Sequence, residues 1–280
     1  MDIKYNVSKL KNSKLEEIKD SVSVEEPLEM RLKYRKDNKW EVENISITMR
    51  TPGNDDDLIK GFLFNERIVK NINDIVSIKH HGEVSGDYNL QNIIEATLSK
   101  IDNIDIGKLK RNFVTNSSCG VCGKTSLDAI EVIKENKLDL SFPKIDEKII
   151  LQSPKLLMNK QSEFSKTGGI HASALIDLIG NVVAIREDVG RHNALDKLIG
   201  HSISKNILNP KQQFIACSGR LNFELVQKGL MANIGVMAGV GAPTSLAIDL
   251  AKRFDMSLLG FVKESSFNIY SNKKRIILSS

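Results

Sequence analysis

Apolar and polar positions alternate over a short segment early in the chain. Within Val42–Met49, the apolar residues Ile45, Ile47 and Met49 alternate with polar ones, which predicts a half-buried strand. The turn sequence at 51–54 and the acidic residues after it predict a helix start. Apolar residues at helical spacing follow it: Leu58, Ile59, Phe62, Leu63 and Ile68.

A second strand is predicted at 93–98, after a loop-like segment. Together these elements predict a small α+β domain over residues 21–115. Residues 1–20 are polar and carry charges of both signs, so we expect a flexible N-terminal extension there.

The second half of the chain predicts alternating strands and helices. Apolar runs between 174 and 188, interrupted by Gly180-Asn181, predict a hairpin with a two-residue turn. Further helices are predicted at 125–135, 193–203, 223–232 and 244–254, and further strands at 213–217, 258–262 and 267–278. This order predicts an α/β fold in which helices cover a sheet.

One uncharged stretch, 229–248, is about as long as a membrane span. It contains four glycines, Asn233 and Pro243, which would interrupt a single lipid-facing helix. We therefore interpret it as a buried strand, a turn and a helix start, and expect no association with a membrane.

Composition narrows the function classes. Forty Lys and Arg against 35 Asp and Glu give a net charge of +5, which favours anionic ligands. Aromatic residues are only 5% of the chain and are not interleaved with basic ones, so we expect no nucleic acid partner. No secretory signal is recognisable, and three cysteines suit reduced thiols better than a disulfide framework, so we expect a cytoplasmic protein.

The sharpest motif is Ser118-Cys119-Gly120-Val121-Cys122-Gly123-Lys124. A predicted helix start and the charge of Lys124 both favour the thiolate form, which is the nucleophilic one. The flanking glycines leave room for a large sulfur donor or acceptor. Such a thiolate can carry sulfur as a persulfide.

The motif alone leaves three other interpretations open. Paired cysteines ligate zinc, but the remaining candidate ligands, His171, His192 and Cys217, are dispersed in the sequence, and we expect no metal. Two cysteines at this spacing also occur in dithiol oxidoreductases. The third interpretation is a structural role without chemistry.

From about Glu25 onward the chain resembles the FdhD family, the formate dehydrogenase accessory sulfurtransferases. The matching segments are Met49–Gly53, Gly61–Leu63, Ser118–Lys124, Gly168–Ala172, Arg186–Lys197, Ser218–Arg220, Ala242–Ala247 and Gly260–Phe261. The resemblance implies a sulfur carrier protein that accepts sulfur from a cysteine desulfurase. It implies a persulfide on Cys119, with Cys122 as a supporting or resolving thiol.

The resemblance also implies the acceptor, the bis-molybdopterin guanine dinucleotide molybdenum cofactor, sulfurated before insertion into the formate dehydrogenase catalytic subunit. It further implies a homodimer and a cytidine-deaminase-like α/β/α larger domain, residues 116–280, that carries the Cys loop. Deaminase chemistry itself needs a His-x-Glu zinc motif. The chain has His171-Ala172-Ser173, so we expect no deamination.

Cofactor-binding residues are expected in three segments. Arg191 and His192 precede a predicted helix, where backbone N–H groups and cationic side chains can hold phosphate. The alternative is that Asp188 and Asp196 pair with Arg191 and Lys197 on a solvated face. Arg220 follows a predicted strand and could also approach a phosphate, whereas Cys217 is expected to be a small buried hydrophobe.

The third segment is the tail stretch Phe261, Val262, Lys263, Glu264, Ser265 and Ser266. The family pattern here is Phe-x-Arg-x-x-Arg, so Lys263 and Ser266 replace two arginines. Lysine keeps the charge but loses the bidentate fork of arginine. Asn222 also stands where the family pattern has serine. His80, His81 and His201 are expected to be surface residues.

Overall fold

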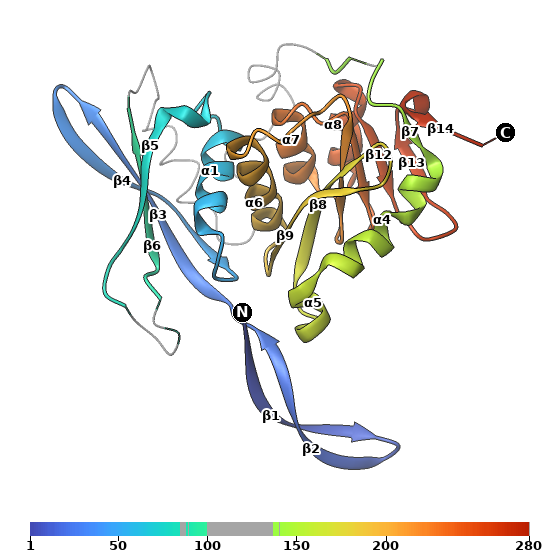
Figure 1. Cartoon of the computed structure of the whole chain (residues 1–280), viewed down its shortest axis with the longest axis horizontal. Helices are drawn as coiled ribbons and strands as arrows, with labels where there is room; N and C mark the ends of the chain where they lie inside the picture. Colours follow the sequence, from blue (N-terminus) through green and yellow to red (C-terminus); the bar gives the residue numbers. More distant parts are fainter. Residues whose placement is uncertain (85–87, 89, 100–136, 140, 280) are drawn as a thin grey trace.

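The computed structural model describes residues 1–84, 88, 90–99, 137–139 and 141–279. Two larger sheets form the body of the molecule, and a hairpin projects from it (Figure 1). The Cys loop and the helix predicted at 125–135 lie outside the described residues.

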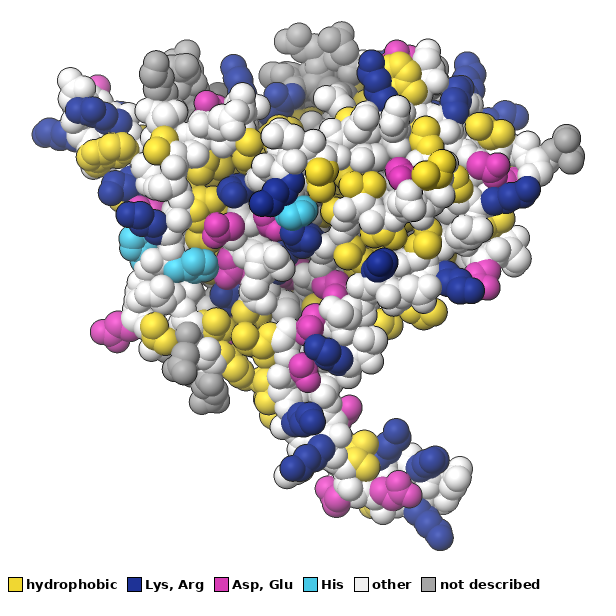
Figure 2. Space-filling view, viewed as in Figure 1, with side chains coloured by type: hydrophobic (Ala, Val, Ile, Leu, Met, Phe, Trp, Pro, Cys, Tyr) yellow, Lys and Arg dark blue, Asp and Glu magenta, His cyan; other side chains and the backbone are white. Residues whose placement is uncertain are grey.

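The projecting hairpin consists of β1 (Asp2–Lys11) and β2 (Lys14–Ser23), paired antiparallel. The two turn residues, Asn12 and Ser13, both have positive φ, as tight two-residue hairpin turns require. The sequence analysis did not predict this hairpin, and the flexibility of the segment stays a prediction. Figure 2 shows basic and acidic side chains interspersed on its surface.

The smaller sheet has the strand order β4-β3-β6-β5. Its strands are β3 (Glu26–Lys36), β4 (Lys39–Arg50), β5 (Ile75–His81) and β6 (Ile93–Leu98). The strands predicted at 42–49 and 93–98 are thus confirmed. A short 3₁₀ helix, η1 (Ile72–Asp74), precedes β5.

Helix α1 (Asp55–Asn65) covers one face of this sheet. Its first turn contains three aspartates, whose negative charges stabilise the positive end of the helix dipole, as predicted. Leu58, Ile59 and Leu63 are fully buried against the sheet. The helix ends at Asn65, so Ile68 joins this core from the following loop.

The larger sheet has the order β13-β12-β11-β10-β8-β9. Its strands are β8 (His171–Asp177), β9 (Val182–Asp188), β10 (Gln213–Cys217), β11 (Val236–Gly239), β12 (Ser257–Gly260) and β13 (Asn268–Ser271). The central strands β10, β11 and β12 are parallel, and the other pairs are antiparallel.

Helices cover both faces of the larger sheet (Figure 1). One face packs on α6 (Arg191–Ser204), α7 (Phe223–Met231) and α8 (Ser245–Arg253), the other on α4 (Glu147–Lys160), which is followed by α5 (Ser162–Thr167). Along β10, Ile215 faces the first group and Phe214 the second, as the period of a strand requires. The α/β fold with a helix-covered sheet is confirmed, while the likeness to cytidine deaminases stays a prediction.

Two turns differ from the sequence expectation. Four residues, not two, connect β8 and β9, because the Asp177 carboxylate accepts hydrogen bonds from the backbone N–H groups of Ile179 and Asn181. The single strand predicted at 267–278 is interrupted after β13, where Asn272 has positive φ. The remainder forms η2 (Lys273–Arg275) and β14 (Ile276–Ile277), which pairs with β7 (Ile145–Asp146).

The uncharged stretch 229–248 comprises the end of α7, the buried strand β11, a turn and the start of α8, which confirms its interpretation as buried structure. Among the described helices, none combines the length and apolar character that crossing a bilayer demands.

The two sheets are joined through the close packing of α1 on α6 (Figure 1). A Cβ atom on Gly61 would lie 1.9 Å from the backbone oxygen of Asp196. On the other helix, a Cβ atom on Gly200 would lie 2.1 Å from the backbone oxygen of Asp57. Only glycine at both positions lets the helix backbones approach this closely.

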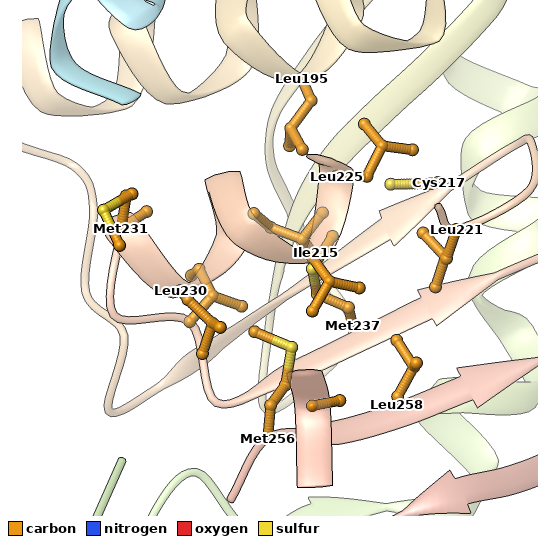
Figure 3. Packing of buried hydrophobic residues seen from close by; sticks show 14 of the residues in the cluster. Leu195, Ile215, Cys217, Leu221, Leu225, Leu230, Met231, Met237, Met256 and Leu258 are labelled. Carbon is orange, nitrogen blue, oxygen red and sulfur yellow. The ribbon is translucent and has the colours of Figure 1, made fainter. Parts of the chain in front are cut away.

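Cys217 ends β10 inside the apolar core beneath α6 and α7 (Figure 3). Its side chain is 3% exposed, and burial raises the pKa of its thiol to about 11. The thiol is therefore protonated at neutral pH. The predicted role of Cys217 as a small buried hydrophobe is confirmed.

Candidate functional site

The carboxyl ends of four strands meet at one edge of the larger sheet. Strands β10, β11 and β12 are parallel, and β9 runs in the same direction because two antiparallel pairings connect it to β10 through β8. In open α/β sheets, ligands bind at such an edge. The segments that follow these strands are 189–192, 218–222, 240–244 and 261–266.

Backbone hydrogen bonds hold three of these segments, 218–222, 240–244 and 261–266, next to one another. Gly241 N donates to Gly219 O at 3.2 Å, and Phe261 N donates to Gly241 O at the same distance. Ser218 N donates to Ala172 O at 2.9 Å, which adds the beginning of β8 to the group. The structure thus brings together the segments of Arg220 and 261–266. Arg191 lies beside them, because its Cδ atom is 3.9 Å from the position of a Cβ atom on Gly219.

Arg191 and His192 are the first two residues of α6, rather than lying ahead of it. The N-cap residue Gly190 supplies no side-chain hydrogen bond, and the first turn contains no acidic residue. The positive end of the helix dipole therefore faces this edge of the sheet. The Nε atom of Arg191 is buried and has no hydrogen-bond partner within the described part of the chain.

The ring of His192 is engaged by α7. Its Nε2 atom lies 2.9 Å from Oε2 of Glu224 and within hydrogen-bond distance of the Asn222 side chain. The hydrogen bond from His192 lowers the pKa of Glu224. Asn222 also caps α7, because its side-chain oxygen accepts a hydrogen bond from Leu225 N. Serine and asparagine are both preferred N-cap residues, so the asparagine at 222 keeps the cap of α7.

His171 is a residue of this edge that the sequence offered only as a dispersed candidate zinc ligand, and not as a cofactor-binding residue. It begins β8 and pairs in register with Asp188 at the end of β9. Its ring lies against Gly219, where a Cβ atom would approach Nδ1 to 3.1 Å. Burial lowers the pKa of His171, and the positive charge of Arg191 acts in the same direction. Its presence in the segment Gly168–Ala172 was the available signal.

The tail residues divide into exposed and buried ones. Lys263, Glu264, Ser265 and Ser266 are exposed, and Lys263 N donates to Ser266 O at 2.8 Å, which closes a turn. Phe261 is 45% exposed with positive φ. Val262 is only 1% exposed, so its side chain belongs to the core and cannot touch a ligand. Arg220 is exposed on the neighbouring turn.

The acidic residues of 188–197 do not lie on a solvated face. Asp188 pairs with Lys197 at 2.6 Å, and both side chains are buried. Asp196 pairs with Lys228 of α7, also in the interior. That alternative interpretation is wrong, since these residues join elements of the core and leave Arg191 without a described ion-pair partner.

His201 is also not a plain surface residue. Its ring contacts Arg186 of β9 and lies 3.3 Å from a carboxylate oxygen of Asp57 in α1. Its side chain is 21% exposed. Burial lowers the pKa of His201, and the charge of Arg186 adds to this effect.

The predicted sulfur-carrying residues Cys119 and Cys122 lie outside the described residues. Where the structure is described, no three side chains of the metal-binding types gather at one place. The expectations for the Cys loop therefore depend on the sequence and on comparison with related proteins.

The model of the FdhD/NarQ family matches residues 23–277. The chain therefore belongs to the FdhD/NarQ family. The match includes the Cys motif and every segment of the strand-end edge, and it begins at the last residue of the projecting hairpin.

Proteins named as sulfur carrier protein FdhD are similar to this chain over nearly their whole length. The sulfur carrier protein FdhD of Picrophilus torridus is 41% identical over 260 residues, 93% of each chain. That of Saccharolobus solfataricus is 38% identical over 273 residues, 98% of this chain and 97% of that protein. That of Streptomyces avermitilis is 39% identical over 261 residues.

The fold is also similar to a crystal structure from Desulfotalea psychrophila, described as that of a formate dehydrogenase accessory protein. The two share a TM-score of 0.71 with 20% identity, and the similarity covers 99% of each chain. This comparison supports the same overall mixed α/β fold for the two proteins.

Proposed function

We propose that this protein is a sulfur carrier in the maturation of formate dehydrogenase, with Cys119 as the persulfide-bearing nucleophile. The observation that carries the proposal is the Cys119–Cys122 motif in a chain 41% identical to a protein named as a sulfur carrier. The buried Cys217, whose thiol stays protonated, is unsuited to that role.

Loading follows ordinary thiol–disulfide chemistry. The Cys119 thiolate attacks the outer sulfur of a persulfide on a cysteine desulfurase, a new S–S bond forms, and the donor cysteine leaves as a thiolate. For delivery, the Cys122 thiolate attacks the inner sulfur, a Cys119–Cys122 disulfide forms and hydrosulfide leaves. A thiol reductant then restores the pair. An external thiol can replace Cys122 in this step, so Cys122 is supporting rather than essential.

The acceptor we propose is the bis-molybdopterin guanine dinucleotide molybdenum cofactor, bound as a substrate before insertion into the formate dehydrogenase catalytic subunit. Its nucleotide ends are polyanions. The strand-end edge suits them, since it combines Arg191 at a helix start with the exposed cations Arg220 and Lys263. We further propose that the protein acts in the cytoplasm, where thiols stay reduced, and as a homodimer.

Two functions of other classes would use the same residues differently. A non-catalytic chaperone would bind the nucleotide ends of the cofactor and gain no sulfur. A dithiol oxidoreductase would reduce disulfide substrates and need both cysteines for turnover. Neither is favoured by a specific contact in the described residues.

Intact-mass analysis after incubation with a cysteine desulfurase and cysteine tests the proposal. We expect a gain of one sulfur atom that a reductant removes. Cys119→Ala should abolish the gain, whereas Cys122→Ala should still load and should lose less of the transfer. Cys217→Ala is the matched control and should load as the unmodified protein does.

Three results would count against the proposal. Loading of Cys119→Ala would show that the nucleophile is wrong, and no loading of the unmodified protein would favour the chaperone. Robust reduction of a disulfide substrate that depends on both Cys119 and Cys122 would favour the oxidoreductase.

A further inference from the structure

Two side chains from different elements lie against Gly219 at the strand-end edge. A Cβ atom at this position would be 3.1 Å from Nδ1 of His171 and 3.9 Å from Cδ of Arg191. Because residue 219 has no side chain, the imidazole of His171 and the aliphatic part of the Arg191 side chain can both lie next to it. Hydrogen bonds in both directions between Ala172 and Ser218 fix the two strand ends that carry this arrangement.

Both side chains retain unused hydrogen-bonding capacity. Nε of Arg191 is buried without a partner among the described residues, which is a costly state for a guanidinium donor. No hydrogen bond from the His171 ring to any described residue is formed either. Buried polar groups in native proteins are nearly always satisfied by a partner, and a bound ligand is one such partner.

The charges that face His171 are positive in balance. From α6 come Arg191 and His192, and from β9 comes Asp188. The Asp188 carboxylate is neutralised by Lys197 at 2.6 Å, and it also accepts hydrogen bonds from backbone N–H groups. Arg191 forms no ion pair within the described residues, although its charge contributes to lowering the pKa of Glu224, whose carboxylate is engaged by His192. An anion between the two side chains would receive donors from both.

We propose that His171 is a phosphate-binding residue, which together with Arg191 holds one phosphate group over Gly219. The assignment of that phosphate to the nucleotide of the cofactor rests on the proposed function. The binding of a phosphate at this place does not depend on sulfur transfer by Cys119.

A pH dependence follows from this geometry. Without a ligand, burial and the neighbouring arginine favour the neutral imidazole. A phosphate would favour the imidazolium, because an opposite charge at short range stabilises the charged form. Ligand binding should therefore raise the pKa of His171, and by linkage binding should tighten as the pH falls.

Proton NMR of the histidine rings tests this directly, with inorganic pyrophosphate and guanosine diphosphate as probes. The His171 signal is the one that disappears in His171→Gln. We expect saturating pyrophosphate to raise the pKa of His171 by about 1, equivalent to about tenfold tighter binding to the protonated form. The signal of His80, an exposed residue of the smaller sheet, is the internal control and should not respond.

Calorimetry on the variants supplies a second measurement. The affinity of the unmodified protein for pyrophosphate should increase as the pH falls. The increase should be steeper than in His171→Gln, because that variant has lost the titration of His171 and keeps only that of pyrophosphate and of other groups. His80→Gln is the control and should show the same dependence of pyrophosphate affinity on pH as the unmodified protein.

Any of three results would overturn the inference. These are an unchanged pKa of His171 at saturating pyrophosphate, the same pH dependence of affinity in the unmodified protein and in His171→Gln, and no binding of pyrophosphate. Sulfur loading of Cys119 would be unaffected by such a result. Conversely, a raised pKa of His171 in a protein that never gains sulfur would uphold the phosphate site and contradict the proposed function.

Discussion

Lys197 of α6 places its Nζ atom 2.6 Å from Oδ2 of Asp188 at the end of β9, and neither side chain is more than 1% exposed. Nζ also donates to Thr51 O at 2.8 Å, and Thr51 N donates to the same carboxylate at 3.2 Å. The pair thus connects the larger sheet to the loop that follows β4. Burial raises the pKa of Asp188, against the effect of the lysine charge.

We predict that Lys197→Met strongly destabilises the protein, because the Asp188 carboxylate is left charged and buried without its partner. Breaking one member of a buried pair costs about 3–5 kcal/mol. The double variant Asp188→Asn with Lys197→Met removes both charges and should be less destabilised than Lys197→Met alone. Denaturant unfolding measures the free energies, and equal losses in the two variants would contradict a charge-pair explanation.

Gly61 makes the contact between α1 and α6 sensitive to a single methyl group. Alanine in an exposed helix interior is about 1 kcal/mol better than glycine. At Gly61 we expect the opposite sign and a loss of at least about 1–3 kcal/mol, because the added Cβ would meet the backbone of Asp196 at 1.9 Å. Gly169→Ala is the control, since its nearest neighbour would be 3.8 Å away. Unchanged unfolding of Gly61→Ala would show that the helices are not packed this closely.

His201 should make stability fall in mild acid. Burial, followed by the charge of Arg186, lowers its pKa, so the unfolded chain binds the proton more readily than the folded protein. The stabilising contribution is present above the ordinary histidine pKa of about 6.5 and is lost as the pH falls below it. The lowered pKa of His171 acts in the same direction. His201→Gln should flatten the decline of the unfolding free energy between about pH 8 and about pH 5, but not abolish it. An identical decline in this variant would exclude His201 as a cause.

Arg220 should contribute to nucleotide affinity through an exposed, salt-sensitive contact. Calorimetry with guanosine diphosphate should show about a tenfold loss in Arg220→Ala and in Arg191→Ala, as expected for a charge-assisted hydrogen bond of about 1.5–3 kcal/mol. Added salt should weaken binding more for Arg220 than for the buried Nε of Arg191. Lys252→Ala removes a charge in the last turn of α8 and serves as the control. Full affinity in both arginine variants would show that the phosphate site lies elsewhere.

Much of the larger domain was predictable, because its buried strands are short apolar runs separated by glycine-rich turns. The strand at 213–217 has the predicted bounds, and the helix predicted at 223–232 begins at Phe223 and ends one residue earlier, at Met231. Helix α4 was not predicted, as it contains Pro154 and buries few of its residues. Strand β3 was also missed, although Leu28, Met30, Leu32 and Tyr34 alternate in the sequence as a strand requires.

The candidate site was predicted in its parts and not in its arrangement. Arg191, Arg220 and Lys263 lie in separate segments of the sequence, and only the sheet order brings these segments to one edge. The place of His171 at this edge was missed, because it depends on the register of β8 with β9 and on the absence of a side chain at Gly219. Long-range pairings of this kind leave no local periodicity in a sequence.

The glycine contact between α1 and α6 has a mechanical consequence for substrate handling. Where two backbones touch without side chains between them, neither helix can slide or roll past the other without a steric clash. The smaller sheet cannot close over the strand-end edge as a hinged lid closes over a bound ligand. Under the proposed function, a large cofactor would be accommodated by rotation of long exposed side chains such as Arg220 and Lys263 rather than by a movement of α1 against α6.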